Sequence, residues 1–257
     1  MIFIPYRIII RDVYIRMNDG RTPGKLKNLR AYMPQALRFY SLKSEGITRG
    51  IFLVILFTSF LSALIQFNTI VTAVMSFVSI TIIYLATAVY LAAYLKDLRG
   101  GEYTAGTCFG VISSNVLKIV AASINYLVTV FVILGFSLAP DAAALLLVAL
   151  TIPITVVYIM FFFAPCFIID KGYGVIDAYK SSRKLTTGKK FAIFLKIIGF
   201  NMITSIPAFF LWMMAAPSNN LLVINFVISF TVAVMNLMQQ RLVALMYIDL
   251  LGEEEAY

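Results

Sequence analysis

The stretch IVTAVMSFVSITIIYLATAVYLAAYL (residues 70–95) decides the fold, because it carries no charged residue over its whole length. A transmembrane helix needs about 20 consecutive, predominantly apolar residues. Five further apolar runs give expected spans at residues 51–66, 119–136, 142–169, 191–215 and from 221 to about 238. The sequence therefore predicts an all-α, polytopic membrane bundle of about six transmembrane helices.

Composition supports a membrane protein and argues against an enzyme. The chain is 61% hydrophobic and 13% charged, whereas soluble domains average about 45–50% and about 25%. It contains no histidine, which excludes Ser–His–Asp triads, HExxH zinc sites and histidine-ligated haem. Cys108 and Cys166 lie in or beside apolar runs without metal-ligand spacing. We therefore expect no catalytic residue, no cofactor and no metal site.

Charge divides the chain into a basic cytoplasmic or interfacial arm at residues 1–48, a six-helix domain at 49–251 and an acidic tail at 252–257. Lys and Arg gather in the arm, in the loop 96–104 and in the segment 170–190, whereas the turns on the opposite side contain none. Cytoplasmic loops of membrane proteins carry such an excess of bases. The distribution predicts that both termini are cytoplasmic.

Two segments of this basic side are predicted to form helices that lie in the membrane interface. These are Gln35–Lys43, after Pro34, and Val175–Thr186, which mixes apolar residues with bases and ends near Gly188. Such helices bind anionic lipids at about 1 kcal/mol per base. Docking to a membrane-protein partner or to a second copy is the alternative. No motif indicates a nucleic-acid partner.

Three short aspartate motifs recur where even-numbered spans reach the cytoplasmic side. They read YLKD (94–97), FIID (167–170) and YID (247–249). An acid at a helix C-terminus opposes the helix dipole and so needs a compensating contact. One hypothesis is that the motifs lock three helical hairpins through ion pairs, and the other is that they are ordinary interfacial acids. The candidate residues are Asp97, Asp170 and Asp249 with Arg99, Arg183, Lys184 and Arg241.

The third helix is expected to begin with an interfacial lead-in up to Lys118, before its span at 119–136. Polar residues recur at helical spacing along this helix and along the sixth. They are Ser114, Lys118 and Asn125 on the third, and Asn225, Ser229, Asn236 and Gln240 on the sixth. Such stripes either line a hydrated cavity or substrate path or hydrogen-bond and pack helices together. Lys118 and Arg241 are expected to extend toward the interface, and a pairing of Arg241 with Asp170 is a further hypothesis.

The run IDAYKSSRKLTTGKKFAIFLKI (176–197) carries a family resemblance, together with APCFIIDKG (164–172) and ALMYIDLL (244–251). It resembles the DUF975 and UPF0259 (YciC-like) group of bacterial integral membrane proteins, which is related to the membrane domain found beside some glycerophosphodiester phosphodiesterases. The resemblance covers about residues 49–251. It implies a six-span protein of the bacterial cytoplasmic (inner) membrane, and it supplies no catalytic residues.

Two functions remain open from the sequence. The leading hypothesis is a non-enzymatic accessory, scaffold or envelope-homeostasis module that acts through protein or lipid partners. It rests on the lack of reactive side chains and on the basic cytoplasmic side. The alternative is a transporter or exporter component for a peptide or lipid, which rests on the polar stripes and on prolines within the fourth and fifth spans.

Overall fold

The computed structural model of the chain describes residues 26–65, 69–122 and 153–252, and within them every regular element is a helix. Six segments are long and apolar enough to cross a membrane. They are Glu45–Leu64, Val74–Leu98, Ala105–Ala122, Pro153–Lys171, Lys190–Ser218 and Leu221–Leu251. The predicted all-α polytopic bundle is confirmed.

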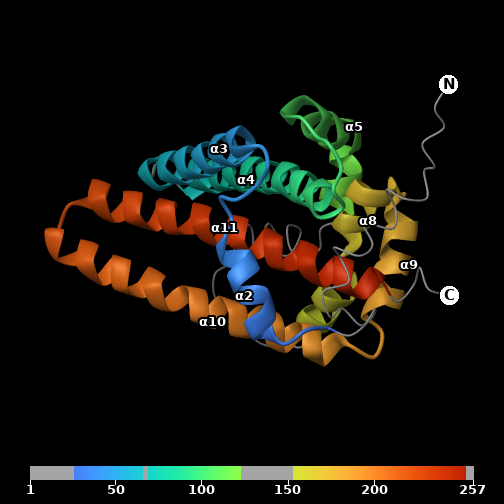
Figure 1. The fold of residues 1–257 in the computed structure, drawn as a ribbon. Helices are drawn as coiled ribbons and strands as arrows, with labels where there is room; N and C mark the ends of the chain where they lie inside the picture. The colour runs from blue at the N-terminus through green and yellow to red at the C-terminus, as the bar shows by residue number, and fades with distance from the viewer. Residues whose placement is uncertain (1–25, 66–68, 123–152, 253–257) are drawn as a thin grey trace, which may run out of the picture.

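Two long helical hairpins form the frame of the bundle (Figure 1). Helices α3 (Glu45–Leu64) and α4 (Thr69–Leu98) make the first, and α10 (Lys190–Ala215) and α11 (Leu221–Leu251) make the second. Helix α11 packs against α3, α4 and α10. The turn of the second hairpin ends at Asn220, whose side-chain oxygen accepts a hydrogen bond from the Leu222 N–H and caps α11.

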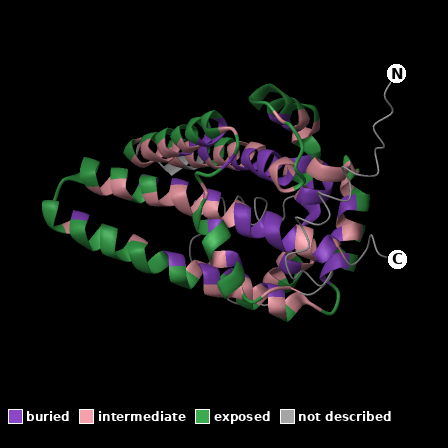
Figure 2. Cartoon of the chain, viewed as in Figure 1, coloured by how far each residue is buried: buried purple, intermediate pink, exposed green. Residues whose placement is uncertain are grey.

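Helices α4 and α11 are longer than a bilayer requires. They contain 30 and 31 residues, which corresponds to about 45 Å each against about 30 Å of hydrocarbon. The excess lies at the end of the bundle that holds Asp97, Asp170 and Asp249, called the charged end below. Buried residues concentrate there, and the opposite halves of the long helices are mostly exposed (Figure 2). The apolar side chains of those exposed halves are placed to face lipid.

Short helices complete the charged end: α2 (Leu29–Leu37), α8 (Ala164–Lys171) and α9 (Val175–Thr186). The fourth span is interrupted at residues 162–163, directly before α8, and Pro165 lies in the first turn of α8. Proline suits a first turn because its missing N–H has no partner there in any case. Prolines within a span predict a kink, and the fourth span is interrupted beside Pro165. Helix α8 ends at Gly172, which has φ +69°.

The amphipathic helix predicted for Val175–Thr186 is confirmed as α9, whereas the one predicted for Gln35–Lys43 is wrong. Helix α2 occupies Leu29–Leu37 and ends where the predicted helix should continue. The reason lies on α11, because the Arg241 guanidinium donates hydrogen bonds to the carbonyls of Gln35 and Arg38. Those carbonyls mark the point where the chain leaves the helix.

Helix α5 (Ala105–Ala122) modifies the expected third span. The predicted boundary between an interfacial lead-in and a span at Lys118 is wrong, because the helix continues through it and loses helical geometry at Asn115 instead. The Ala121 carbonyl accepts a 2.6 Å hydrogen bond from the Tyr179 hydroxyl of α9. The end of α5 therefore lies at the charged end. The remainder of this span, through residue 136, lies outside the described residues.

Candidate functional site

Asp170 joins three parts of the charged end that are far apart in sequence. Its carboxylate accepts a 2.6 Å hydrogen bond from Arg99, just after α4, and a 3.0 Å hydrogen bond from the Tyr247 hydroxyl of α11. The Asp170 side chain is 6% exposed, whereas that of Arg99 is 40% exposed. One of the hypothesised ion pairs is thus formed, and a buried tyrosine supplies the second contact.

The other two aspartates have different surroundings. Asp249 accepts a 2.9 Å hydrogen bond from the Tyr32 hydroxyl of α2, rather than an arginine or lysine. Asp97 has one carboxylate oxygen, Oδ1, that is buried with no hydrogen-bond partner among the described residues. The positive charges that act on Asp97 are those of Lys43 and Arg241. The hypothesis of three equivalent ion pairs is therefore wrong for the described residues, because among them only Asp170 meets an arginine directly.

Arg241 lies inside the charged end and does not extend toward the membrane interface. The residue is 3% exposed, and its guanidinium donates hydrogen bonds to the carbonyls of Gln35, Arg38 and Ser41. It also lies 4.2 Å from the centre of the Tyr94 ring, a distance typical of a cation–π contact. The expected pairing with Asp170 is wrong. Arg241 instead holds the connection between α2 and α3 against α4 and α11.

Helix α9 closes the break in the fourth span. The Ser182 hydroxyl donates to the Met160 carbonyl at 2.9 Å and accepts from the Phe163 N–H at 3.2 Å. A helix that stops inside an apolar layer leaves such backbone groups without partners, and Ser182 provides one for each. Ser182, which belongs to the run 176–197, therefore stabilises the break in the fourth span.

The opposite face of α9 is basic and exposed. Lys180, Arg183 and Lys184 lie on it, together with Ile176, which is 69% exposed. Within the described residues, Arg183 makes no ion pair with Asp97, Asp170 or Asp249 as hypothesised, whereas the pairing of Lys184 stays a prediction. The basic face, defined as Lys180, Arg183 and Lys184, points away from the packed core.

The two predicted polar stripes do not face each other in the part of the chain that the structure describes. Helix α5 packs against α4, α8 and α9, whereas α11 packs against α3, α4 and α10. Three of the seven stripe side chains bond within their own helix. Ser114 donates to Gly110, Lys118 donates to Asn115 and Asn236 donates to Val232. Ser229 is buried, Asn225 is half-buried and Asn125 lies outside the described residues.

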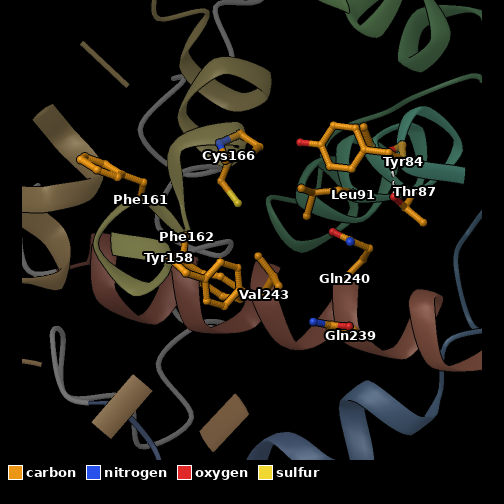
Figure 3. A pocket seen from close by; sticks show the side chains of 12 residues that line it. Tyr84, Thr87, Leu91, Tyr158, Phe161, Phe162, Cys166, Gln239, Gln240 and Val243 are labelled. Carbon is orange, nitrogen blue, oxygen red and sulfur yellow. Dashed lines mark hydrogen bonds between the residues drawn. The ribbon is translucent and has the colours of Figure 1, made fainter. Parts of the chain in front are cut away.

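Gln240, the last stripe residue, lines a cleft of about 70 Å³ between α4, the fourth span and α11. In Figure 3, Tyr84, Thr87 and Leu91 lie on one side of the cleft and Cys166, Tyr158 and Phe162 on the other. The sequence does not mark these residues as a site, because single polar side chains within apolar runs carry no periodic signal. Among the described residues, the lining is Tyr84, Thr87, Ala88, Leu91, Tyr158, Phe161, Phe162, Pro165, Cys166, Gln239, Gln240 and Val243.

Comparison with known proteins identifies no relative of this chain. No family model matches it, and neither the curated proteins nor the solved structures contain a match. Two local features of the structure bear on its function: the basic face of α9 and the cleft beside the interrupted fourth span.

Proposed function

We propose that this chain is a non-enzymatic accessory or scaffold module of the bacterial cytoplasmic membrane, and that it works through the basic face of α9. The charged end then lies in the cytoplasm. The ligand is the anionic headgroup layer of the membrane or an acidic surface of a membrane-protein partner. The observation that carries the proposal is that Lys180, Arg183 and Lys184 share one exposed face.

The position of α9 supports a role in binding. Its buried face is fixed by Ser182 and by the buried side chains of Ala178 and Leu185. The bases are therefore presented on a packed helix, and little order is lost when a ligand binds. At about 1 kcal/mol per charge near an anionic surface, three bases give about 3 kcal/mol. Repulsion by the exposed Asp177 of the same helix leaves about 2 kcal/mol, or a factor of about 30 in affinity.

The chemistry of the remaining side chains agrees with a binding role. The sequence has no histidine, and both cysteines are fully buried in apolar surroundings. Catalytic thiols typically occupy electropositive and partly exposed positions. The hydrogen bonds between tyrosines and aspartates at the charged end join helices to one another, and their role is therefore structural.

Neutralising the basic face tests the proposal. The triple variant Lys180→Gln, Arg183→Gln, Lys184→Gln is compared with the charge-preserving control Lys180→Arg, Arg183→Lys, Lys184→Arg in nanodiscs of phosphatidylcholine and phosphatidylglycerol. Retained phosphatidylglycerol is measured by mass spectrometry after delipidation, and proteins captured by cross-linking in native membranes are identified. The neutral variant should lose both the retained phosphatidylglycerol and the cross-linked proteins, and the control should keep the phosphatidylglycerol. Equal retention and capture by all three proteins would contradict the proposal.

A transport function is the second candidate, and the interrupted fourth span favours it. Transporters commonly build substrate sites where a membrane helix is broken, and here the break at residues 162–163 borders the cleft. Vesicles of phosphatidylcholine and phosphatidylglycerol with a fluorescent phosphatidylethanolamine test lipid transfer between leaflets. Transfer that is faster with the protein than in empty vesicles would favour this candidate over the first.

A further inference from the structure

We propose that the cleft between α4, the interrupted fourth span and α11 binds the uncharged glycerol and ester region of a membrane lipid. The proposal is independent of the basic face of α9. It rests on four features of the cleft: its polar groups without partners, its lack of charge, its depth in the membrane and its size.

Three lining side chains have polar groups that the protein leaves without partners. Within the described residues, neither Gln239 nor Gln240 nor Tyr158 makes a side-chain hydrogen bond. All three residues are half-buried, and a polar group that faces an apolar membrane layer without a hydrogen bond is unfavourable by up to roughly 2–7 kcal/mol, depending on the reference state. Two amides and a phenol that converge on one cleft therefore indicate a polar occupant that donates and accepts hydrogen bonds.

The part of the lining that the structure describes contains no Asp, Glu, Lys or Arg. A phosphate or carboxylate would enter this cleft without a counter-charge, which is strongly unfavourable where the dielectric constant is low. Ester carbonyls and hydroxyls suit the site better, because an amide N–H donates to a carbonyl and an amide oxygen accepts from a hydroxyl. The aromatic rings of Phe161 and Phe162 and the side chain of Leu91 surround these groups with apolar surface.

The depth of the cleft matches the ester region of a bilayer. Gln240 directly precedes Arg241, which binds the connection between α2 and α3, and that connection carries the exposed bases Arg38 and Lys43. From Leu221 to Gln240 the helix rises about 29 Å at about 1.5 Å per residue, close to one hydrocarbon thickness. The cleft thus lies at the boundary between the hydrocarbon and the headgroup region.

The size of the cleft limits what enters it. The cleft has a volume of about 70 Å³, several times the roughly 10–15 Å³ of such space that holds one water molecule. It therefore admits a small group such as an ester or a glycerol but is too small for whole acyl chains. Those chains have a place outside. Ile82 on α4 and Val156 and Val157 beside Tyr158 are each about 40% exposed and apolar.

Photolabelling of the full chain tests the proposal. The protein is placed in phosphatidylcholine nanodiscs with a trace of a diacylglycerol that carries a diazirine near its ester groups, and the labelled residues are located by mass spectrometry. We expect labels on residues 82–91, 156–166 or 239–243, and displacement by unlabelled dioleoylglycerol. Gln240→Leu and Tyr158→Phe should each reduce labelling about three- to tenfold, the effect of one lost hydrogen bond.

Asn236→Leu is the matched control, because Asn236 is an amide of the same helix that already donates to Val232 and does not line the cleft. Its labelling should equal that of the unchanged protein, and gel filtration and melting temperature establish that each variant is folded. Equal labelling of the Gln240→Leu, Tyr158→Phe and Asn236→Leu variants would overturn the proposal. If dioleoyl phosphatidic acid displaces the photolabel as effectively as dioleoylglycerol does, the proposal that the ligand is uncharged is overturned. If free glycerol displaces the photolabel equally well, the proposal that the ligand is a lipid is overturned.

Discussion

Replacement of Asp170 by asparagine is expected to lower the free energy of unfolding by about 2 kcal/mol. The Tyr247 hydroxyl is fully buried and donates to the carboxylate at 3.0 Å. A hydrogen bond to a charged group contributes about 1.5–3 kcal/mol and a neutral one about half of that, so loss of the charge removes about 1–1.5 kcal/mol. Arg99 is 40% exposed, which limits its ion pair to about 1 kcal/mol or less.

A double-mutant cycle apportions this loss between the two partners. Thermal unfolding in detergent is followed by circular dichroism for Asp170→Asn, Tyr247→Phe, Arg99→Gln and the pairwise combinations. At about 2–4 °C per kcal/mol for a chain of this size, Asp170→Asn should lower the melting temperature by about 4–8 °C. The coupling of Asp170 to Tyr247 should exceed its coupling to Arg99, because the tyrosine contact is buried and the arginine contact is half open to solvent.

Glu102→Gln is the matched control for Asp170→Asn, because it makes the same change of charge at an exposed acid in the loop before α5. It should change the free energy of unfolding by less than about 0.5 kcal/mol. If Asp170→Asn changes the free energy of unfolding as little as Glu102→Gln does, the Asp170 contacts do not stabilise the charged end. That result would refute the reasoning.

Three further substitutions probe other contacts of the charged end. Arg241→Met removes the donors that hold the connection between α2 and α3, so trypsin should cleave after Arg38 at least several-fold faster than in the unchanged protein, and an unaltered cleavage rate would contradict the assigned contacts. Ser182→Ala should reduce thermal stability by about 1–3 kcal/mol, because it leaves a buried N–H and a carbonyl unpaired, whereas the neighbouring Ser181→Ala should have an effect below about 0.5 kcal/mol. Gly172→Ala should destabilise by about 1 kcal/mol in a chemical unfolding titration, because φ is +69°; an increase in stability would show that the turn relaxes.

The apolar runs and the distribution of bases were sufficient to predict the helical architecture, because both signals are local. The fifth span was predicted at residues 191–215 and is observed as Lys190–Ala215. The α9 helix was predicted with the same bounds because bases and apolar residues alternate at helical spacing. Each of these predictions needs only neighbouring residues.

The contacts of the charged end depend on tertiary structure, and the sequence predicts them only in part. Asp170 was a candidate for an ion pair with Arg99, and the structure forms that pair. Tyr247 was not predicted as the second partner, since a tyrosine at the end of an apolar run looks like an ordinary interfacial residue. Arg241 was misassigned for a related reason. Its partners are backbone carbonyls more than 200 residues away, and backbone carbonyls leave no mark in a sequence.

The helix lengths explain why acidic residues are tolerated at the charged end. An aspartate near a helix C-terminus is unfavourable by about 0.3–1 kcal/mol, whereas a charge-assisted hydrogen bond contributes about 1.5–3 kcal/mol. For Asp170 and Asp249 the tyrosine contacts at 3.0 and 2.9 Å therefore outweigh the dipole. Because α4 and α11 extend about 15 Å beyond the hydrocarbon thickness, lipid cannot cover their ends. Those ends must pack as a water-soluble core does, with buried apolar side chains and directional polar contacts, and the aspartates supply the acceptors.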